Sequence, residues 1–484
     1  MIVAKALTKR YGDKDILVNT DFTLGNGKKV GLVGRNGCGK TTLLKILVGL
    51  EDPTSGSIQV TNEVLGYIPQ EFSFPDELVG EYLEKKLSDN WEFYKVETLA
   101  SKLKFHNFDI YQEIKTLSEG QKMKVKLIET LLKNPTTLFI DEPTNHLDIE
   151  GIQWFEEYIK NLDITVLMIS HDRSFLNHTV DEIWEIEKCK ILSFVGGYDN
   201  YKSEKLRLID KWDAEYVRFL KKKTQLEKLL DNVHKIKGGK KRGSAVEAVK
   251  KRIAREIESD KKEKYVIKKV KDFKFDTDVR YGKLMIRFEN VSKKFDRKTV
   301  FNNLNLELRG MEKVWLFGPN GSGKTTLVKI LIGEEKVTSG SITIGENIKI
   351  GYFAQNQEYL KQNKDLLETF MGLTECDYGP AFGYLKKFLF DKDAIKKRLW
   401  QLSPGERARF AFAVFAYKNY DLLILDEPDN HLDIETKEVI EKSIAEFKGT
   451  LFLVSHDRYF VESVGITKVL NLKDGKLSFF NAST

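Results

Sequence analysis

Short runs of apolar residues alternate with longer segments in which apolar residues recur every three or four positions, near both ends of the chain. Three such runs are KKVGLVG at 28–34, TLFID at 137–141 and TVLMIS at 165–170. They are continuous rather than alternating, which is typical of strands buried on both faces of a parallel sheet. A polar motif and then a helical pattern follow each run. We therefore expect an α/β fold with a parallel core sheet and functional side chains at the carboxyl ends of its strands.

The middle of the chain has a different pattern, in which apolar positions are spaced by three and four residues. If Lys223 fills one missing position, they form a heptad seam of Ile209, Trp212, Tyr216, Phe219, Leu226, Leu230 and Val233. A second stretch at 244–257 places Val246, Val249, Ile253 and Ile257 on one side. Gly238, Gly239 and Gly243 interrupt the pattern between the two stretches. We predict an antiparallel helical hairpin whose first helix has about 33 residues and a length of roughly 50 Å.

The motifs of the chain occur twice with a nearly constant separation. GRNGCGKTT at 34–42 returns as GPNGSGKTT at 318–326, 284 positions later. LSEGQ at 117–121, FIDEPTNHLD at 139–148 and ISHDRSF at 169–175 return 285 positions later as LSPGE, ILDEPDNHLD and VSHDRYF. This duplication predicts two homologous domains, 1–198 and 282–484, with a linker at 199–281 between them.

The first repeated motif fits the phosphate-binding loop GxxxxGK[ST], because it follows an apolar strand and precedes a helical pattern. Its glycines let backbone N–H groups close around phosphates at a helix N-terminus. We expect Lys40 and Lys324 to contact the β and γ phosphates of a nucleotide, and Thr41 and Thr325 to ligate Mg²⁺. The predicted nucleotide-binding residues of the two loops are Gly34, Asn36, Gly37, Gly39, Lys40, Thr41 and Thr42, then Gly318, Asn320, Gly321, Gly323, Lys324, Thr325 and Thr326.

Acidic residues end the second apolar strand in each copy. Asp141 and Asp426 are candidates to hold the Mg²⁺ shell, and the adjacent Glu142 and Glu427 to polarise an attacking water. The alternative for these two glutamates is a helix-capping or salt-bridging role. His171 and His456 follow a third strand and are candidates to hydrogen-bond the γ-phosphate, or else are structural. Neither copy contains a His/Cys cluster that suggests a metal other than Mg²⁺.

LSEGQ and LSPGE are ambiguous when each is considered alone. A serine followed by glycine at the start of a helical pattern offers hydroxyl and N–H groups to a phosphate, but it is also an ordinary helix N-cap.

The full set of motifs resembles the ATP-binding cassette family, in which two cassettes face each other head to tail. The resemblance implies that Lys40, Gln70, Glu142 and His171 share one ATP with Ser403 and Gly405. Lys324, Gln355, Glu427 and His456 then share a second ATP with Ser118 and Gly120, and Gln70 and Gln355 also approach the metal. Tyr11 and Phe295 match the aromatic residue that stacks on adenine, although such a ring could equally belong to the core.

Two cassettes with EPTNHLD and a charged helical linker look like the ABC-F group of ribosome-associated ATPases. This resemblance implies action near the exit site for tRNA, with the linker tip directed toward the peptidyl-transferase region. The group includes translation factors and ribosome-protecting antibiotic-resistance proteins. Asp429, where the first copy has Thr144, and the ending Pro404–Glu406 of the second signature depart from the usual pattern. Proline fits a first helical turn, so we expect the second site to remain competent, with a turnover rate that can differ from that of the first.

Charge is concentrated in the linker. The whole chain has a net charge of +7, whereas residues 201–271 contain 24 Lys and Arg against 11 Asp and Glu. The tip, His234–Gly243, has no acid and carries the predicted RNA-binding residues Lys235, Lys237, Lys240, Lys241 and Arg242. Such a segment points to contact with a polyanion, and the ABC-F resemblance implies that this polyanion is ribosomal RNA and tRNA. The alternative is a solvated charged hairpin without a partner.

The remaining observations bear on location and assembly. We see no secretory signal, no apolar run near the roughly 20 residues of a membrane span, and only three cysteines. We expect a cytoplasmic protein that pairs its own cassettes as a monomer, without a membrane subunit, an extra arm in the first cassette or a C-terminal coiled coil. Two competing hypotheses are the ATPase subunit of a transporter and a DNA-maintenance ATPase. Co-sedimentation with ribosomes rather than membranes or DNA would discriminate among the three.

Overall fold

The computed structural model describes residues 1–87, 89–105, 108–145, 147–235, 240–258, 270–295, 298–354, 364–430 and 432–481. The chain forms two compact units. The larger combines Met1–Tyr198 with Lys269–Thr484, and the smaller is Asp199–Lys268. We refer to the two parts of the larger unit as its N-terminal half and its C-terminal half.

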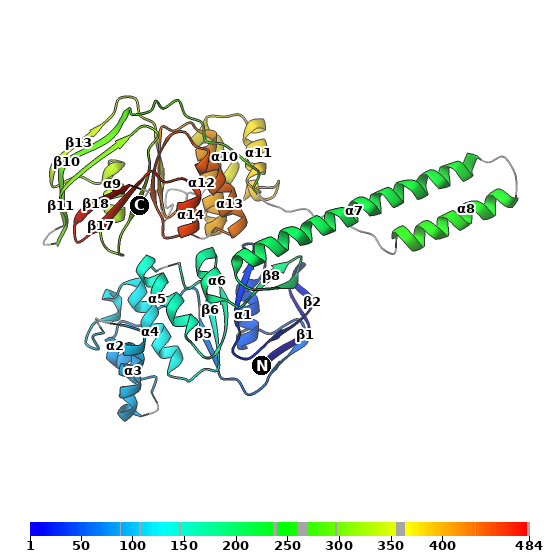
Figure 1. Cartoon of the computed structure of the whole chain (residues 1–484), viewed down its shortest axis with the longest axis horizontal. Helices are drawn as coiled ribbons and strands as arrows, with labels where there is room; N and C mark the ends of the chain where they lie inside the picture. The colour runs from blue at the N-terminus through cyan, green and yellow to red at the C-terminus, as the bar shows by residue number, and fades with distance from the viewer. Residues whose placement is uncertain are drawn as a thin grey trace. The chain divides into compact units, whose positions relative to one another are not determined.

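The N-terminal half contains a small antiparallel sheet and a larger mixed sheet (Figure 1). The small sheet has the order β2-β1-β4, and the larger has the order β5-β6-β7-β3-β8-β9. The larger sheet is parallel from β5 to β8, and β9 pairs antiparallel at its edge. The strands are β1 Ile2–Tyr11, β2 Lys14–Leu24, β3 Lys29–Gly34, β4 Ser55–Val60, β5 Leu65–Ile68, β6 Thr137–Asp141, β7 Thr165–Ile169, β8 Glu182–Glu187 and β9 Lys190–Val195.

The C-terminal half repeats this topology strand for strand. Its small sheet has the order β11-β10-β13 and its large sheet the order β14-β15-β16-β12-β17-β18, again with an antiparallel edge strand. The strands are β10 Leu284–Phe295, β11 Lys298–Arg309, β12 Lys313–Phe317, β13 Ser339–Ile344, β14 Ile350–Phe353, β15 Leu422–Asp426, β16 Thr450–Val454, β17 Lys468–Lys473 and β18 Lys476–Asn481. The expected α/β fold with a parallel core and an internal duplication is confirmed.

Helices follow the strands as the apolar pattern predicts. Those of the N-terminal half are α1 Lys40–Val48, α2 Val79–Glu84, α3 Tyr94–Lys102, α4 Glu119–Leu131, α5 Ile149–Lys160 and α6 Arg173–Thr179. Those of the C-terminal half are α9 Lys324–Leu331, α10 Leu366–Thr374, α11 Tyr378–Lys387, α12 Pro404–Tyr417, α13 Ile434–Ala445 and α14 Arg458–Ser463. Short 3-10 turns complete them at Asn90–Phe93, Ile114–Thr116, Ala394–Lys396 and Leu399–Gln401.

The core lies against the large sheets. All five residues of β6, β7, β15 and β16 are buried, because helices or the small sheet cover both faces of these strands. Residues 270–275, which the sequence places in the linker, also contribute to this core. Val270, Phe273 and Phe275 are buried in the same cluster as helices α10–α13. The apolar residues of VKDFKFD at 270–276 could have predicted from the sequence that this segment packs against the core.

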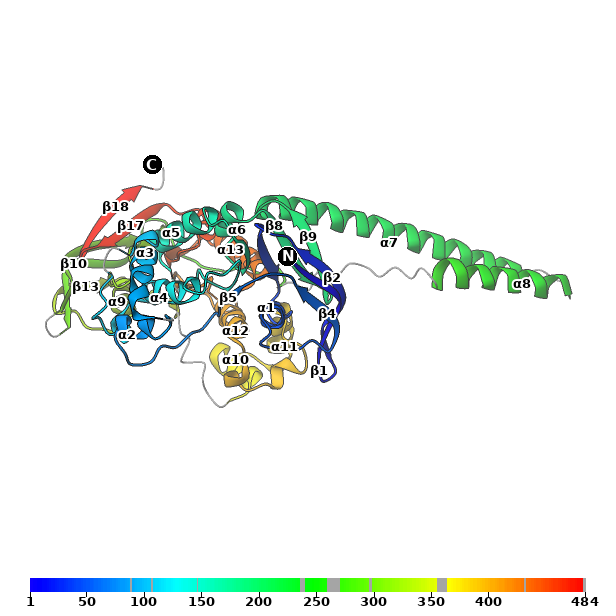
Figure 2. The ribbon, with the colours of Figure 1, turned by 90° about the horizontal axis from the view of Figure 1, so that it is seen from below.

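The smaller unit consists mainly of two helices. Helix α7 spans Tyr198–Lys235 and helix α8 spans Lys240–Ile253, and a π-helical turn follows at Ala254–Glu258. Figures 1 and 2 both show α7 and α8 side by side and antiparallel. Leu226, Val249 and Ile257 are buried, and the Lys222 ammonium lies 3.1 Å from the Glu256 carboxylate. The predicted hairpin is therefore present.

Two details of the hairpin differ from the prediction. Helix α7 has 38 residues rather than about 33. Gly243 lies inside α8 instead of interrupting the helical pattern, because one glycine costs only about 1 kcal/mol in a helix and the flanking residues favour helix. The predicted tip residue Lys237, with Gly238 and Gly239, lies outside the described residues.

Candidate functional site

The two GxxxxGKT loops connect β3 to α1 and β12 to α9. Gly39 and Gly323 precede these helices with φ angles of 105° and 101°. A Cβ atom at Gly39 would lie 2.2 Å from Ile16 Cγ2, and one at Gly323 would lie 2.5 Å from Val300 Cγ1. Only glycine meets both the conformational and the steric requirement at these positions. The helices begin at Lys40 and Lys324, so their N-terminal amides face the loops, as an anion site requires.

Both loop lysines are buried and point back into their own loops. Lys40 Nζ donates to the carbonyl oxygens of Gly34 at 2.7 Å and Arg35 at 3.3 Å. Lys324 Nζ makes the equivalent bonds to Gly318 at 2.7 Å and Pro319 at 3.2 Å. The ammonium groups are thereby fixed inside the loop, where they can neutralise phosphate charge.

Asp141 and Asp426 end strands β6 and β15 beside the threonines that follow the loop lysines. Both oxygens of Asp141 and Oδ2 of Asp426 are buried and make no conventional hydrogen bond to the described residues. Burial raises the pKa of Asp426 to about 7 and the neighbouring Glu427 adds to this, while Lys324 and the Thr325 hydroxyl oppose it. A buried carboxylate beside a hydroxyl fits a hard cation that retains water and phosphate ligands, as Mg²⁺ does. No cluster of three or more His, Cys, Asp or Glu residues in the described ranges is arranged to hold a metal by itself.

Glu142 and Glu427 adopt a backbone conformation that is rare for glutamate. Their φ angles are 53° and 49°, in the left-handed region. The Glu142 amide donates to Ile169 O at 3.0 Å and the Glu427 amide to Val454 O at 2.8 Å, both at the ends of neighbouring strands. These bonds hold each glutamate in the strained conformation, which is typical of functional positions.

Each glutamate faces the histidine of the third strand. The distance between His171 Nε2 and Glu142 Oε1 is 3.2 Å, and between His456 Nε2 and Glu427 Oε1 it is 3.7 Å. Burial raises the pKa of Glu142 to about 7; Lys40 opposes the shift and Asp141 adds to it. Burial also lowers the pKa of His456 to about 4, helped by Lys324. In each site the carboxylate and the imidazole lie close enough to orient a water molecule and a phosphate oxygen.

A cavity of about 920 Å³ joins the second phosphate loop to the first half of the chain. From the C-terminal half it is lined by Phe295, Thr299, Val300, Pro319–Thr326, Glu427, His456, Asp474 and Gly475. From the N-terminal half it is lined by Leu117, Ser118, Glu119, Asn145 and Leu147. The structure thus brings the predicted Ser118 to the loop of Lys324, in the head-to-tail order.

Contacts at the two phosphate loops link the halves in both directions. The Asn320 amide donates to Asp148 Oδ2 at 3.0 Å, and the Asn36 amide to Asp433 Oδ2 at 3.4 Å. The other oxygen of each aspartate caps its own helix, α5 or α13. Asp148 and Asp433 were not among the predicted site residues, although the repeated NHLD was a signal that could have identified them.

The signature serines have a structural role as well. Ser118 and Ser403 are the N-caps of α4 and α12, and each forms a capping box with the residue three positions later. Gly120 lies in the first turn of α4 and Gly405 in the first turn of α12. Pro404 occupies the first turn of α12 without disturbing it, as proline does at that position.

The remaining predicted residues lie at the edges of the sites. Tyr11 and Phe295 are 47% and 45% exposed, so neither ring belongs to the core. Lys9 Nζ lies 5.0 Å from the centre of the Tyr11 ring, and Lys293 Nζ lies 4.4 Å from the centre of the Phe295 ring. Gln70 follows β5 and is partly exposed. Gln355 lies outside the described residues.

Comparison with known proteins agrees with this architecture. The family model described as ABC transporter matches residues 17–145 and 301–430. The chain is 33% identical to ABC transporter F family member 2 of Arabidopsis thaliana, over 97% of the chain and 76% of that protein. It is 30% identical to the ribosome protection protein VmlR of Bacillus subtilis (strain 168), over 96% of the chain and 85% of that protein.

A solved structure has a similar fold. It contains the archaeal ribosome recycling factor aABCE1 with the ribosomal stalk protein aP1, and it superimposes with a TM-score of 0.66 at 22% identity. The superposition covers 97% of this chain and 88% of that chain. This likeness concerns the fold. Among the described residues, no helix combines the length and apolar character needed to cross a membrane.

Two phosphate loops, each followed by a buried aspartate, an adjacent glutamate and a histidine on a duplicated α/β fold, define a tandem ATP-binding cassette ATPase. More particularly, the chain belongs to the ABC-F family. Its N-terminal and C-terminal halves are its first and second cassettes.

Proposed function

We propose that this ATPase closes two Mg-ATP molecules between its cassettes and acts on the ribosome. The observation that carries the first part is the cavity in which Ser118 and Glu119 of one cassette meet the phosphate loop of the other. A site made from both cassettes couples nucleotide binding to their association, because each cassette supplies only part of the contacts.

The side chains have distinct roles in this proposal. Lys40 and Lys324 neutralise the transferred phosphate, and the amides at the starts of α1 and α9 hold its oxygens. Thr41 with Asp141, and Thr325 with Asp426, hold Mg²⁺, which neutralises developing charge on the phosphates when bound. Glu142 and Glu427 orient the attacking water, and His171 and His456 hydrogen-bond the γ-phosphate. Gln70 and Gln355 complete the metal shell.

The ribosome is the partner that the observations favour. Residues 201–271 of the linker contain 24 Lys and Arg against 11 Asp and Glu, and the hairpin has a basic tip, which suits a phosphate-rich groove. The relative VmlR is named a ribosome protection protein. We propose that the tip of the hairpin enters through the exit site for tRNA toward the peptidyl-transferase region. The cellular role is that of a cytoplasmic translation factor or a ribosome-protecting resistance protein.

The test is ribosome co-sedimentation of the Glu142→Gln/Glu427→Gln variant with ATP. This variant should bind ATP, hydrolyse it very slowly and accumulate on ribosomes, because water is no longer oriented toward the γ-phosphate. The matched control is the same variant with Lys40→Ala and Lys324→Ala, which should remain in the supernatant. Wild-type turnover in the glutamine variant would refute the assigned roles, and sedimentation that is independent of ATP would refute the coupling to the ribosome.

A further inference from the structure

The two cassettes differ in a buried charged pair at their interface. Asp429 and Lys437 of the second cassette stand where the first has Thr144 and Ile152, 285 positions earlier. All four positions are buried, at 6%, 5%, 9% and 4% exposure respectively. Two neutral residues in one copy therefore correspond to a carboxylate and an ammonium group in the other.

The local framework around these residues is otherwise the same in both copies. In the first cassette the hydroxyl oxygens of Thr144 and Ser170 lie 3.4 Å apart, and Ser170 Oγ accepts the Asp172 amide at 3.1 Å. In the second, Ser455 Oγ donates to Asp429 Oδ1 at 2.8 Å and accepts the Asp457 amide at 3.0 Å. The charged pair is thus an addition to a shared framework.

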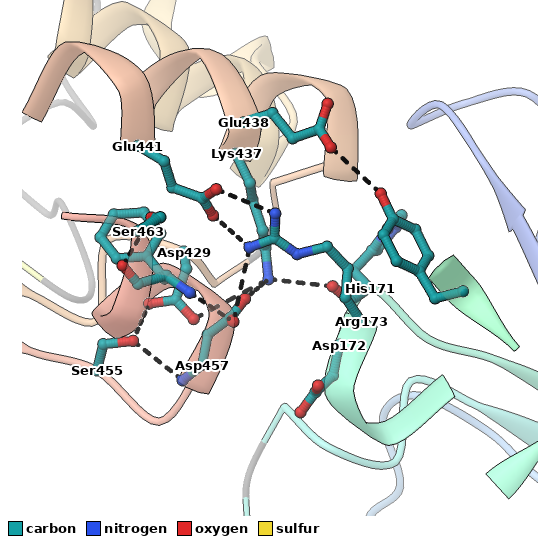
Figure 3. Close-up of polar contacts among 12 residues, drawn as sticks. His171, Asp172, Arg173, Asp429, Lys437, Glu438, Glu441, Ser455, Asp457 and Ser463 are labelled. Atoms are coloured by element: carbon teal, nitrogen blue, oxygen red, sulfur yellow. Dashed lines mark hydrogen bonds and ion pairs between the residues drawn. The ribbon is translucent and has the colours of Figure 1, made fainter. Parts of the chain in front are cut away.

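Lys437 reaches out of its own cassette (Figure 3). Its Nζ atom lies 3.1 Å from Asp457 Oδ2 and 4.0 Å from Asp429 Oδ2, and it donates to the backbone carbonyl of His171 at 3.3 Å. Burial alone would lower the pKa of Lys437, but Asp457 and Asp429 outweigh it and raise the pKa. The ammonium group is therefore charged when it binds the histidine segment of the first cassette.

A second contact holds the same segment. The guanidinium group of Arg173 makes a two-pronged ion pair with the Glu441 carboxylate, with one N–O distance of 3.0 Å, and it lies 3.7 Å from Asp457. Figure 3 shows both prongs, and all three side chains are buried. His171 thus lies in a segment that two buried cationic contacts join to helix α13 of the second cassette and to Asp457.

The reciprocal contacts at His456 are weaker. Arg458 lies 3.9 Å from Glu156, and its side chain is 29% exposed against 3% for Arg173. Ile152, the counterpart of Lys437, has no group that can donate to the His456 carbonyl. The histidine–glutamate distance is also longer in the second cassette, 3.7 Å against 3.2 Å.

We propose that Lys437 is a positioning residue for His171, so that a buried cation of the second cassette orders the first ATP site. This inference rests on the proposed role of the two histidines at the γ-phosphate. It makes the sites unequal: His171 reaches its working geometry only when α13 of the other cassette is in place, whereas His456 depends less on its neighbour.

The test replaces the charged pair of the second cassette with the neutral pair of the first. Asp429→Thr/Lys437→Ile gives the second cassette the residues that the first already accommodates, so it should fold. Measured with Glu427→Gln, where only the first site turns over, this variant should lower kcat on the order of tenfold with KM within about twofold. With Glu142→Gln, where only the second site turns over, kcat should stay within about twofold.

Two controls separate positioning from loosening of the fold. Asp429→Thr alone keeps the Lys437 contacts to Asp457 and His171 and should leave the first site unchanged. Lys313→Met removes a lysine that donates to three carbonyls inside the second cassette, at 2.7–3.0 Å, and should not single out the first site. In the opposite direction, Thr144→Asp/Ile152→Lys should raise the kcat of the second site.

An equal decrease in kcat at both isolated sites, or no decrease at either site, would overturn the proposal. These kcat measurements need no ribosome. They are also distinct from failure of the proposed catalytic roles, which would appear as continued turnover in Glu142→Gln/Glu427→Gln.

Discussion

Glu142 combines two unfavourable features in one residue: a left-handed backbone and a buried carboxyl group. A non-glycine residue in this conformation costs about 1 kcal/mol or more. Burial raises the pKa of the Glu142 carboxyl group to about 7. Both features lower the stability of the nucleotide-free protein, and both place the side chain where β6 and β7 end.

The raised pKa of Glu142 predicts a stability effect that depends on pH. Between its usual pKa of 4.5 and about 7, the unfolded chain has lost this proton while the folded chain keeps it, so stability falls as pH rises. Glu142→Gln removes this dependence. Without nucleotide, the melting temperature of the variant minus that of the wild type should increase from pH 4.5 to about 7 and then level off. The limiting gain is at most about 3 kcal/mol.

Glu142→Asp is the control, since it keeps a titrating group at the same position. A stability difference for Glu142→Gln that is constant with pH would show that the carboxyl group titrates normally in the folded chain.

Residue types at the site were predictable from the sequence wherever the chemistry fixes them. Lys40 and Asp141 follow from the motif, because phosphate needs a cation and Mg²⁺ needs a carboxylate. The positive φ of Glu142 was not predictable, since nothing in DEPTNHLD demands it. The role of Lys437 was not predictable either, because it depends on a contact between residues 266 positions apart.

At the scale of elements, helix α8 continues through Gly243 although glycine has a low helix propensity, because the flanking residues favour a helix. Gly243 lies within α8 and its φ is outside the left-handed range, and a Cβ atom there would meet nothing within 4 Å. The sequence pattern treated it as a break, since glycine is the usual residue at helix ends. The strand runs were easier to predict, because β6 and β15 are buried on both faces and their sequences are uninterrupted.

Replacing Gly243 should therefore stabilise the hairpin. Gly243→Ala should add up to about 1 kcal/mol to α8, because alanine loses less backbone entropy on folding. Amide hydrogen exchange of residues 244–253 in the full chain should slow by about fivefold. Ala245→Gly is the reverse control and should accelerate exchange by a similar factor. Faster exchange in Gly243→Ala would mean that the helix does not continue through this position.

The basic tip predicts a salt-dependent contact with RNA. Changing Lys235, Lys237, Lys240, Lys241 and Arg242 to Ser should move ribosome co-sedimentation of the Glu142→Gln/Glu427→Gln variant to lower salt and flatten its slope, because fewer counterions are released. Basal ATPase activity should persist, while stimulation by ribosomes should fall. A matched control changes five exposed basic residues of α7 to Ser: Arg207, Lys211, Arg218, Lys221 and Lys228. Identical salt curves for the two variants would mean that the tip has no special role.

At the scale of the whole molecule, the composite cavity predicts that a substitution in one cassette stops ATP hydrolysis at the phosphate loop of the other. Ser118→Arg should abolish most turnover in the Glu142→Gln background, where only the site of Lys324 is active, because the new side chain fills the cavity. In the Glu427→Gln background, where only the site of Lys40 is active, the effect should be small. Thr116→Arg, two residues earlier and exposed, is the matched control. The opposite pattern between the two backgrounds would mean that each cassette hydrolyses its own ATP without the other.

Joining both cassettes in a single polypeptide has a consequence for Lys437. In a homodimer of identical cassettes, every substitution appears twice, so a lysine at this position would approach both histidine segments and the two sites would remain equivalent. Fusion of the two copies into one gene removes this constraint, because each copy can then mutate alone. On this proposal, Asp429 and Lys437, present in one copy only, give the duplicated ATPase two unequal sites, which a symmetric pair cannot encode.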